Sequence, residues 1–364
     1  MREIRSSKLL RLAALLACCM ALPAAAERVD NLYRERVLVA NQSIEVRNQA
    51  AVEALRLVLM RASGRHALGE AESLSRALAK PQRLIESFRY ETAADNESGQ
   101  AQTRLQLTFS QSSVEDLLRE AGLPIWPANR PSILIWLVND DIHAGRQVVA
   151  FAEKPELEAQ LLASAQQRGL PEVLPLSDLE DQLSIGAEQL WRLDLPAIEA
   201  ASARYAVDAI LVGRYSQTSG GEWLASWSLQ HRQKQQLFDS RGADIEGLFN
   251  QGLGAVANYF SGIYGITATD RRVATQIMEV SGVDRFQSYV ALTDYLDSLE
   301  VLRHVQLLEV RGQSLRFALQ PEGPMSLLLD ALALDKRLNP EAVAGIDGPR
   351  GQPASQLLRF YWGG

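Results

Sequence analysis

The sequence predicts a mixed α/β (α+β) protein built from three small α/β domains in series. Apolar residues recur at helical spacing in some segments and at strand spacing in others. Three prolines, Pro124, Pro127 and Pro131, fall within eight residues and mark the boundary between the first and the second domain. The last hundred residues follow the order β-α-β-β-α-β, which is typical of a ferredoxin-like domain. A chain of 364 residues is long enough for two or three apolar cores.

The first 26 residues are typical of a signal peptide for export. Three basic residues precede the apolar stretch Leu9–Leu22, and the small residues Ala24–Ala26 precede Glu27. The apolar stretch is shorter than the roughly 20 residues that span a bilayer. We therefore expect cleavage after Ala26 and release into the periplasm, with no transmembrane segment after the signal.

The leader also contains an alternative processing site. Leu15-Leu16-Ala17-Cys18 resembles a bacterial lipoprotein signal, in which Cys18 would carry a lipid anchor and hold the protein on a membrane. Leu16 is unusual at its position in such a signal, so the sequence favours soluble release. Cys18 and Cys19 are the only cysteines. Cleavage after Ala26 would leave no thiol for a disulfide, a zinc-thiolate site or a nucleophile.

The charge excludes two classes of partner. Removing residues 1–26 leaves 33 basic residues (37 − 4) and 43 acidic residues (44 − 1), a net charge of −10. A chain of this charge is repelled by nucleic acid and by anionic membranes. We therefore expect no nucleic-acid partner and, unless Cys18 is lipidated, no membrane partner.

The N-terminal domain is predicted to cover residues 27–123 with the order β-α-α-β-β-α. Ser43 is a favourable N-cap for a helix that Gly64 ends. The remaining elements are expected as follows: strands at 36–39, 84–90 and 104–109, a hairpin loop at 95–99, and helices at 70–80 and 113–121.

A Pro-rich linker at 124–131, fixed to a neighbouring surface by Trp126, is expected to lead into a central domain at 132–268. Ile133–Val138 is a continuous apolar run, as in strands that are covered on both faces. Ser177 with Glu180 forms a predicted capping box. The other elements are expected at these positions: helices at 155–168, 197–205 and 244–264, and strands at 172–174, 208–215, 222–230 and 235–239.

The C-terminal domain, residues 269–364, has the clearest pattern. We expect strands at 273–280, 305–310, 314–319 and 357–362, and helices at 284–299 and 324–338. Asp284 is the expected N-cap of the first helix. Alternation in the last strand places Leu358, Phe360 and Trp362 on one face. These elements together make the ferredoxin-like domain.

Several runs of residues resemble an uncharacterised proteobacterial family of exported proteins, domain of unknown function 2066. The matching runs are 117–126, 129–131, 135–137, 168–171, 174–181, 209–214, 280–283 and 289–299. The resemblance implies an envelope address but no activity, ligand or cofactor. More loosely, the central strand and meander are similar to small α/β domains of periplasmic envelope-assembly proteins, such as the N-terminal domain of the Tol-system propeller protein.

Asp140, Asp141 and His143 are the candidate metal-binding or acid-base residues. They follow a predicted buried strand, and ligand sites of open α/β sheets lie beyond the carboxyl ends of strands. The alternative interpretation, a solvated polar loop, is favoured because no second cluster of ligands is found at metal-binding spacing.

Two further motifs have structural interpretations that we favour. Gly252–Ala257 matches a dinucleotide-binding fingerprint but lies within a predicted helix rather than after a strand. Ser63 and His66 are close in sequence, but we interpret this segment as a helix end, with no third group to orient a nucleophile. No catalytic residue is assigned.

The aromatic residues Tyr215, Trp223 and Trp227 could form a face for a glycan or a peptide. Packing of a meander against helices is the commoner role of such residues, and we favour it. Trp126 and Trp136 are likewise expected to be structural.

The leading functional hypothesis is a non-enzymatic periplasmic protein that acts through contacts with envelope proteins in envelope assembly or maintenance, without a cofactor. The first alternative is a metal-dependent hydrolase centred on Asp140, Asp141 and His143. The second is a binding protein for a cell-wall fragment or small ligand in an interdomain cleft.

Overall fold

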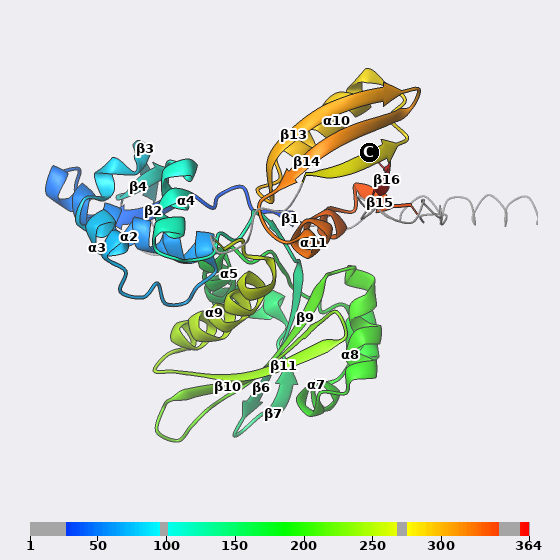
Figure 1. Ribbon diagram of the computed structural model, residues 1–364. Helices are drawn as coiled ribbons and strands as arrows, with labels where there is room; N and C mark the ends of the chain where they lie inside the picture. Colours follow the sequence, from blue (N-terminus) through cyan, green and yellow to red (C-terminus); the bar gives the residue numbers. More distant parts are fainter. Residues whose placement is uncertain (1–26, 95–100, 268–274, 342–356, 364) are drawn as a thin grey trace, which may run out of the picture.

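The computed structural model describes residues 27–94, 101–267, 275–341 and 357–363, and it has three lobes, each built on its own β-sheet (Figure 1). The mixed α+β class with several sheets is confirmed. A two-stranded pair, β1 (Glu27–Arg28) and β5 (Asn129–Arg130), joins the start of the described chain to the Pro-rich segment. Within the described residues no helix is both long and apolar enough to cross a bilayer. The expected hairpin loop at 95–99 lies outside the described residues.

The N-terminal lobe is an antiparallel sheet of order β2-β4-β3 with helices on one face. Ser43 caps α2 by accepting a hydrogen bond from the Val46 amide, and Gly64 ends it in the left-handed region at φ 65°, both as predicted. The bounds are β2 (Arg34–Val39), α2 (Ile44–Ser63), α3 (Glu72–Ala79), the 3-10 helix η2 (Pro81–Arg83), β3 (Ile85–Ala94), β4 (Ala101–Phe109) and α4 (Gln111–Glu120).

The central lobe is a six-stranded mixed sheet between two layers of helices. Its order is β11-β10-β9-β6, with β7 and β8 both on the outer edge of β6, and β6 runs parallel to β8 and β9. The strands are β6 (Ile133–Asp141), β7 (Gly145–Val148), β8 (Glu172–Val173), β9 (Ala209–Gln217), β10 (Trp223–His231) and β11 (Lys234–Gly242).

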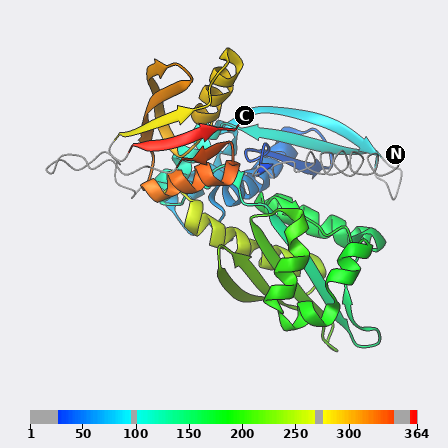
Figure 2. The same ribbon diagram turned by 90° about the vertical axis from the view of Figure 1, so that its right-hand side faces the viewer.

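Odd residues of β6 such as Ile135 face α5 (Pro155–Arg168) and α9 (Ile245–Tyr264), whereas even residues such as Trp136 face the other helical layer. This burial on both faces explains the continuous apolar run in β6. The second layer appears at the front of Figure 2 and consists of α6 (Leu179–Ser184), α7 (Ala187–Arg192) and α8 (Leu195–Ser202). Two 3-10 turns complete the lobe, η3 (Phe151–Glu153) and η4 (Ala203–Tyr205).

The C-terminal lobe has the predicted order of elements along the chain, β-α-β-β-α-β, with one short strand added before the last. Its sheet departs from the antiparallel sheet of a ferredoxin-like domain, because the last strand runs parallel to the first. Its sheet order is β13-β14-β12-β16, with β12 and β16 parallel, and a short strand β15 is added at the edge. Phe360 and Trp362 are buried as the predicted alternation requires. The bounds are β12 (Gln276–Ser281), α10 (Phe286–Asp297), β13 (Leu302–Arg311), β14 (Ser314–Pro321), α11 (Met325–Asp335), β15 (Leu338–Pro340) and β16 (Leu358–Trp362).

Two predicted helix caps are wrong by one residue. Asp178, not Ser177, is the N-cap of α6 and accepts the Asp181 amide at 3.0 Å, because Ser177 takes a left-handed conformation at φ 55°. In α10 the cap position is Arg285, which makes no side-chain cap bond. The Asp284 carboxylate instead lies 3.4 Å from the Arg285 guanidinium.

The Pro-rich segment, which we expected to be a linker, is mostly buried between the lobes. Trp126 is 1% exposed, stacks on Phe260 of α9, and its amide donates to the Ala62 carbonyl at the end of α2 (2.7 Å). Ile125 forms a β-bridge with Ile266. The segment therefore fastens the end of α2 to α9 as part of a core.

Arg130 is fully buried at this junction, with its guanidinium 3.8 Å from the centre of the Trp126 ring. Its three nitrogens donate to five main-chain carbonyl oxygens at 2.9–3.1 Å, those of Arg61, Trp126, Pro127, Arg168 and Gly169. Three of these carbonyls lie at the C-terminal ends of α2 and α5, where the helix dipoles are negative. Arg130 thus ties the N-terminal and central lobes together.

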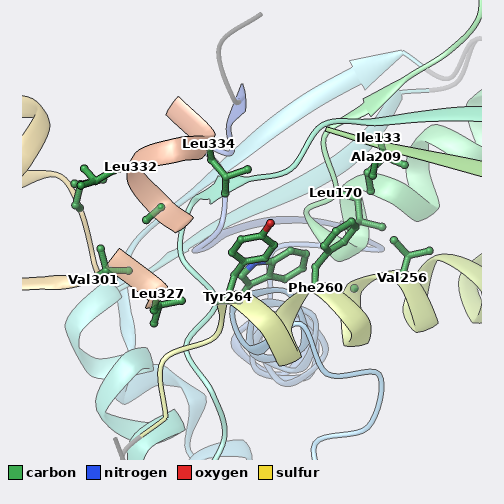
Figure 3. Packing of buried hydrophobic residues seen from close by; sticks show 14 of the residues in the cluster. Ile133, Leu170, Ala209, Val256, Phe260, Tyr264, Val301, Leu327, Leu332 and Leu334 are labelled. Carbon is green, nitrogen blue, oxygen red and sulfur yellow. The ribbon is translucent and has the colours of Figure 1, made fainter. Parts of the chain in front are cut away.

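A single apolar cluster continues from the central lobe into the C-terminal lobe. It includes Phe260 and Tyr264 of α9 together with Leu327 and Leu334 of α11, which Figure 3 shows near one another. Because this core includes residues on both sides of the predicted boundary at 268, it does not separate the two domains there, and the predicted boundaries stay predictions.

Candidate functional site

The predicted polar loop at Asp140, Asp141 and His143 is part of a β-hairpin, so our placement of the two aspartates after the strand is wrong. Both aspartates belong to β6, which continues two residues beyond Asn139 because β7 pairs with it. The hairpin was missed because β7, Gly145–Val148, is polar on its exposed side and lacks alternation. Asp140 lies directly opposite Arg146 in the register.

The two carboxylates have structural partners. Oδ1 of Asp141 accepts the amides of His143 (2.8 Å) and Ala144 (2.9 Å) and so closes the turn. These hydrogen bonds, that from Ala144 foremost, lower the pKa of Asp141 below its ordinary value. Asp140 lies 3.5 Å from the Arg146 guanidinium, which also bonds to Glu188. A carboxylate that closes a turn is committed to the fold rather than to a ligand.

The hydrolase hypothesis gains no support from this geometry. Across residues 27–94, 101–267, 275–341 and 357–363, no group of three or more His, Cys, Asp or Glu side chains is placed to hold a metal ion. His143 is exposed, and its amide rather than its ring contacts Asp141. We derive no step of chemistry from these residues.

Ser63 and His66 do not form a nucleophile and base pair. Ser63 Oγ is buried and donates to the Leu59 carbonyl (2.7 Å), one turn back in α2. His66 Nδ1 lies 3.1 Å from a nitrogen of Arg168, and burial together with this guanidinium lowers the pKa of His66. The favoured interpretation of a helix end agrees with the left-handed cap at Gly64.

Gly252–Ala257 lies in the interior of α9, as the helical interpretation predicts. A Cβ on Gly252 would lie 2.5 Å from the Trp227 ring, and one on Gly254 would lie 2.7 Å from His66 Nδ1. These glycines let α9 approach the sheet and the end of α2 closely, so they have a packing role.

Two of the three aromatic residues of the meander are core residues, which confirms the packing interpretation for them. Trp227 is 1% exposed, stacks on Phe238 and donates its Nε1 hydrogen to Ser240 Oγ (2.8 Å), while Tyr215 is 4% exposed. Trp223 is half-buried and packs against Tyr215. These side chains leave no aromatic platform for a ligand.

An open groove of about 780 Å³ lies between the N-terminal and central lobes. One side is formed by residues 29–31 and 34–36 with Arg61, and the other by the end of α5 and residues 169–172. The groove has the location expected in the ligand-binding hypothesis, but its lining alternates in charge. Glu35 already pairs with Arg61. Binding of a cell-wall fragment there stays a prediction.

The most unusual exposed surface is the α6 leucine surface, which we define as Leu176, Leu179 and Leu183. Their exposed fractions are 66%, 70% and 79%. Leu179 and Leu183 are one turn apart and share a face of α6, and Leu176 lies two residues before the N-cap of the helix, Asp178. Single exposed leucines are normal on proteins, whereas a group on one short helix marks a contact surface.

A buried polar network holds this helix in place. Asp181 is 3% exposed and accepts hydrogen bonds from the Tyr205 hydroxyl (2.5 Å) and the Ser177 amide (2.8 Å). Arg204 binds both oxygens of Asp178 at 2.8 and 2.9 Å. These Arg204 bonds, with the Asp181 amide, lower the pKa of Asp178 to about 2. The leucines therefore project from a helix that is fixed before any partner binds.

The α6 leucine surface was missed by sequence reasoning. The sequence predicts a capping box at Ser177 and Glu180 but makes no prediction about the leucines of this segment. The shortness of the helix was the available signal. A helix of six residues has little surface to bury, so leucines before and after its N-cap cannot all enter the core. Only the structure shows that Ile185, immediately after the helix, is the residue that enters the core.

The comparisons with known proteins assign no activity. Residues 26–127 match the family model of a domain of unknown function, DUF8605. This match contradicts the resemblance to domain of unknown function 2066, which is therefore wrong; it rested on short runs, many of them beyond residue 127. No curated protein matches the chain.

Two solved structures are similar to part of the chain at low TM-scores. Lipoprotein GNA1162 from Neisseria meningitidis is 14% identical, with a TM-score of 0.22, over 36% of this chain and 99% of its own. A structure described as an uncharacterized protein is 13% identical, with a TM-score of 0.15, over 37% of this chain and 98% of its own. At these TM-scores neither likeness bears on fold, compartment or function.

Proposed function

We propose that the protein is a non-enzymatic periplasmic component of cell-envelope assembly or maintenance, and that it acts through contacts with other envelope proteins. The observation that carries the proposal is the α6 leucine surface, in which Leu179 and Leu183 lie on a helix fixed by Asp181, Tyr205 and Arg204, and Leu176 lies just before it.

The energetics of this surface favour protein contact. Burial of a leucine side chain contributes roughly 1.5–3 kcal/mol, so a partner that covers all three gains a substantial part of a binding energy. The fixed helix adds to this gain, because a preorganised surface loses little conformational entropy on binding.

The location of the protein in the periplasm is part of the proposal. Support comes from the leader with its small residues before Glu27. Mass spectrometry of the protein from its own cells is expected to give Glu27 as the first residue, with release by osmotic shock without detergent. A lipidated Cys18 as the first residue would replace the soluble assignment by a membrane-anchored one.

The contact surface is tested by Leu179→Ser combined with Leu183→Ser. In cells that lack the native gene, the wild-type protein is expected to restore resistance of the envelope to detergent, and the double variant is expected to fail although it accumulates normally. The matched control is Ile142→Ser combined with Leu237→Ser, two other exposed apolar residues on the same lobe. Full function of the α6 variant, or equal loss in the control, would remove the support for this surface.

A further inference from the structure

The open face of the N-terminal sheet carries four exposed arginines. The register places Arg36 of β2 and Arg89 of β3 on either side of Gln106 in β4. Arg34 and Arg104 lie two residues from Arg36 and Gln106 on their own strands, and so on the same face. All four arginines are exposed. We call these residues the arginine face.

The arginine face is positive in a chain whose net charge is −7. The register places one carboxylate among the four arginines, that of Glu91, which bonds to Arg89 at 2.7 Å and lies 3.9 Å from Arg36. Arg34 bonds to the Asn31 side chain, and Arg104 has no acidic partner within the described residues. The excess of positive charge thus lacks internal compensation.

Gln106 prepares two of the guanidinium groups for a ligand. Its side chain is 7% exposed, and its Oε1 accepts hydrogen bonds from Arg36 Nε (3.0 Å) and from a terminal nitrogen of Arg89 (3.1 Å). Among the described residues, Arg36 makes these contacts through Nε, which leaves its two terminal nitrogens for a ligand. A planar guanidinium with two parallel donors matches a carboxylate or a phosphate in bidentate fashion.

The interlobe groove continues this face. Arg34 and Arg36 line the groove together with the uncharged side chains of Gln166 and Gln167 of α5. Glu35 is paired with Arg61, and the other two carboxylates of the lining, Asp30 and Glu172, take part in interactions of their own. A ligand on the arginine face can therefore extend into a hollow that offers amide groups.

We propose that the arginine face binds an extended acidic segment of a partner protein, whose carboxylates pair with Arg34, Arg36, Arg89 and Arg104. Alternate residues along a strand are roughly 6.6 Å apart. An extended peptide has the same repeat, so alternate acidic side chains can meet successive arginines of the face. This surface lies on a different lobe from α6, and the proposal stands independently of the function proposed above.

Nucleic acid and an anionic membrane would also match the positive charge of the arginine face, but neither fits the other side chains of the surface. Phe88 and Tyr90 lie opposite Leu107 and Leu105 on the helix-covered side, so in the described part of the sheet the open face offers no aromatic ring for stacking nucleic-acid bases. Leu38 is the apolar side chain that the register places on the face, and one leucine inserts little area into a bilayer. The acidic remainder of the chain also opposes an anionic membrane.

The test uses the chain from Glu27 to Gly364 and a fluorescein-labelled ten-residue peptide of alternating Glu and Thr, with a Lys and Thr peptide as the reference. Fluorescence anisotropy at low salt is expected to show binding of the acidic peptide only, and the affinity is expected to fall as salt is added. Arg36→Ser combined with Arg89→Ser is expected to weaken binding about tenfold or more. Arg36→Lys combined with Arg89→Lys keeps the charge but loses the bidentate fork, so an intermediate affinity is expected.

The control is Arg192→Ser combined with Arg241→Ser, two exposed arginines of the central lobe, which is expected to bind like the wild type. Circular dichroism melting of each variant checks folding. Affinity that is unchanged by Arg36→Ser with Arg89→Ser would overturn the proposal. So would tighter binding of vesicles of phosphatidylglycerol, or of a single-stranded oligonucleotide, than of the acidic peptide.

Discussion

Arg130 and the arginine face put the same side chain in opposite surroundings. Arg130 is fully buried and gives its donors to five main-chain carbonyls, whereas the four arginines of the face are exposed and two of them contact a carboxylate, that of Glu91. The difference shows which arginines stabilise this protein and which are available to a partner. Every donor that is satisfied inside the chain contributes to the fold, and every donor that is left at the surface can contribute to binding.

The charge of Arg130 is retained despite its burial. Desolvation, together with the nearby Arg61 guanidinium, lowers the pKa of Arg130 to about 9. The group is therefore still protonated at neutral pH. Carbonyls at the negative ends of α2 and α5, and the face of the Trp126 ring, replace the hydration that the cation has lost.

The largest effect is expected for Arg130→Met. The substitution keeps the length of the side chain but leaves buried carbonyls at two helix ends without their donor. We expect a loss of about 3–5 kcal/mol in the free energy of unfolding, measured by urea denaturation. Arg241→Met, at an exposed position of β11, is the control and is expected to change stability by less than about 0.5 kcal/mol. A stability of Arg130→Met equal to that of the control would show that the junction does not depend on this arginine.

A pH-dependent effect is expected at His231. Its ring lies between the hydroxyls of Tyr259 (3.3 Å) and Tyr264 (3.0 Å), and burial, with the nearby Arg232, lowers its pKa to about 4. Between pH 4 and about 6.5 the His231 ring is protonated in the unfolded chain but neutral in the folded chain. The neutral ring therefore contributes its full share of stability above pH 6.5, and this share is lost as the pH falls towards 4.

The loss attributable to His231 is expected to be about 3 kcal/mol over this pH range. The measurement is the difference between wild type and His231→Gln in urea unfolding from pH 7 to pH 4, with NMR titration of the His231 ring. An NMR pKa near 6.5 would contradict the account of its surroundings.

A smaller effect is expected for Gly169→Ala, which tests the space around Arg130. Gly169 has φ 61°, and a Cβ there would lie 2.4 Å from a terminal nitrogen of Arg130. Gly122→Ala is the matched control, because Gly122 has φ 69° but open space around it. Both variants lose the glycine conformation at a cost of about 1 kcal/mol. Gly169→Ala is expected to lose more stability than Gly122→Ala, because its new methyl group meets Arg130. Equal melting temperatures of the two variants would argue against a close approach of Arg130 to Gly169.

The smallest effect on stability is expected on the arginine face. Arg36→Ser combined with Arg89→Ser removes exposed side chains and surface ion pairs, which contribute little to stability. We expect a change within about 1 kcal/mol in urea unfolding, even though the same variant loses peptide binding. A large destabilisation would mean that these arginines resemble Arg130 in role.

The elements that the sequence predicted well are those set by local chemistry. The helix at Pro155–Arg168 has the predicted bounds, and Ser43 is the predicted N-cap of α2. The helix predicted at 244–264 is found with Asp244 as its N-cap. Proline, glycine and capping side chains act within one turn, so these elements follow from local sequence. The order of strands and helices along the C-terminal lobe also followed from local periodicity, which is clearest in β14. The parallel pairing of β16 with β12 did not follow, because it depends on contacts between the two ends of the lobe.

The features that the sequence did not predict depend on contacts between distant residues. Nothing local distinguishes the buried Arg130 from the exposed Arg36, since each owes its surroundings to strands and helices far along the chain. The register of β2, β4 and β3 creates the arginine face, and the burial of residues 124–131 depends on α9. The same holds for α6, whose leucines lie outside the core although leucine is a common core residue.

The central claim is that the α6 leucine surface contacts another envelope protein, and crosslinking in living cells tests it most directly. A photoreactive amino acid is placed at Leu179 in one strain and at Leu237 in another, two leucines of similar exposure on the same lobe. Illumination is expected to give a defined adduct with a second protein from position 179 and none from position 237. No adduct at position 179, or the same adducts from both positions, would contradict the claim.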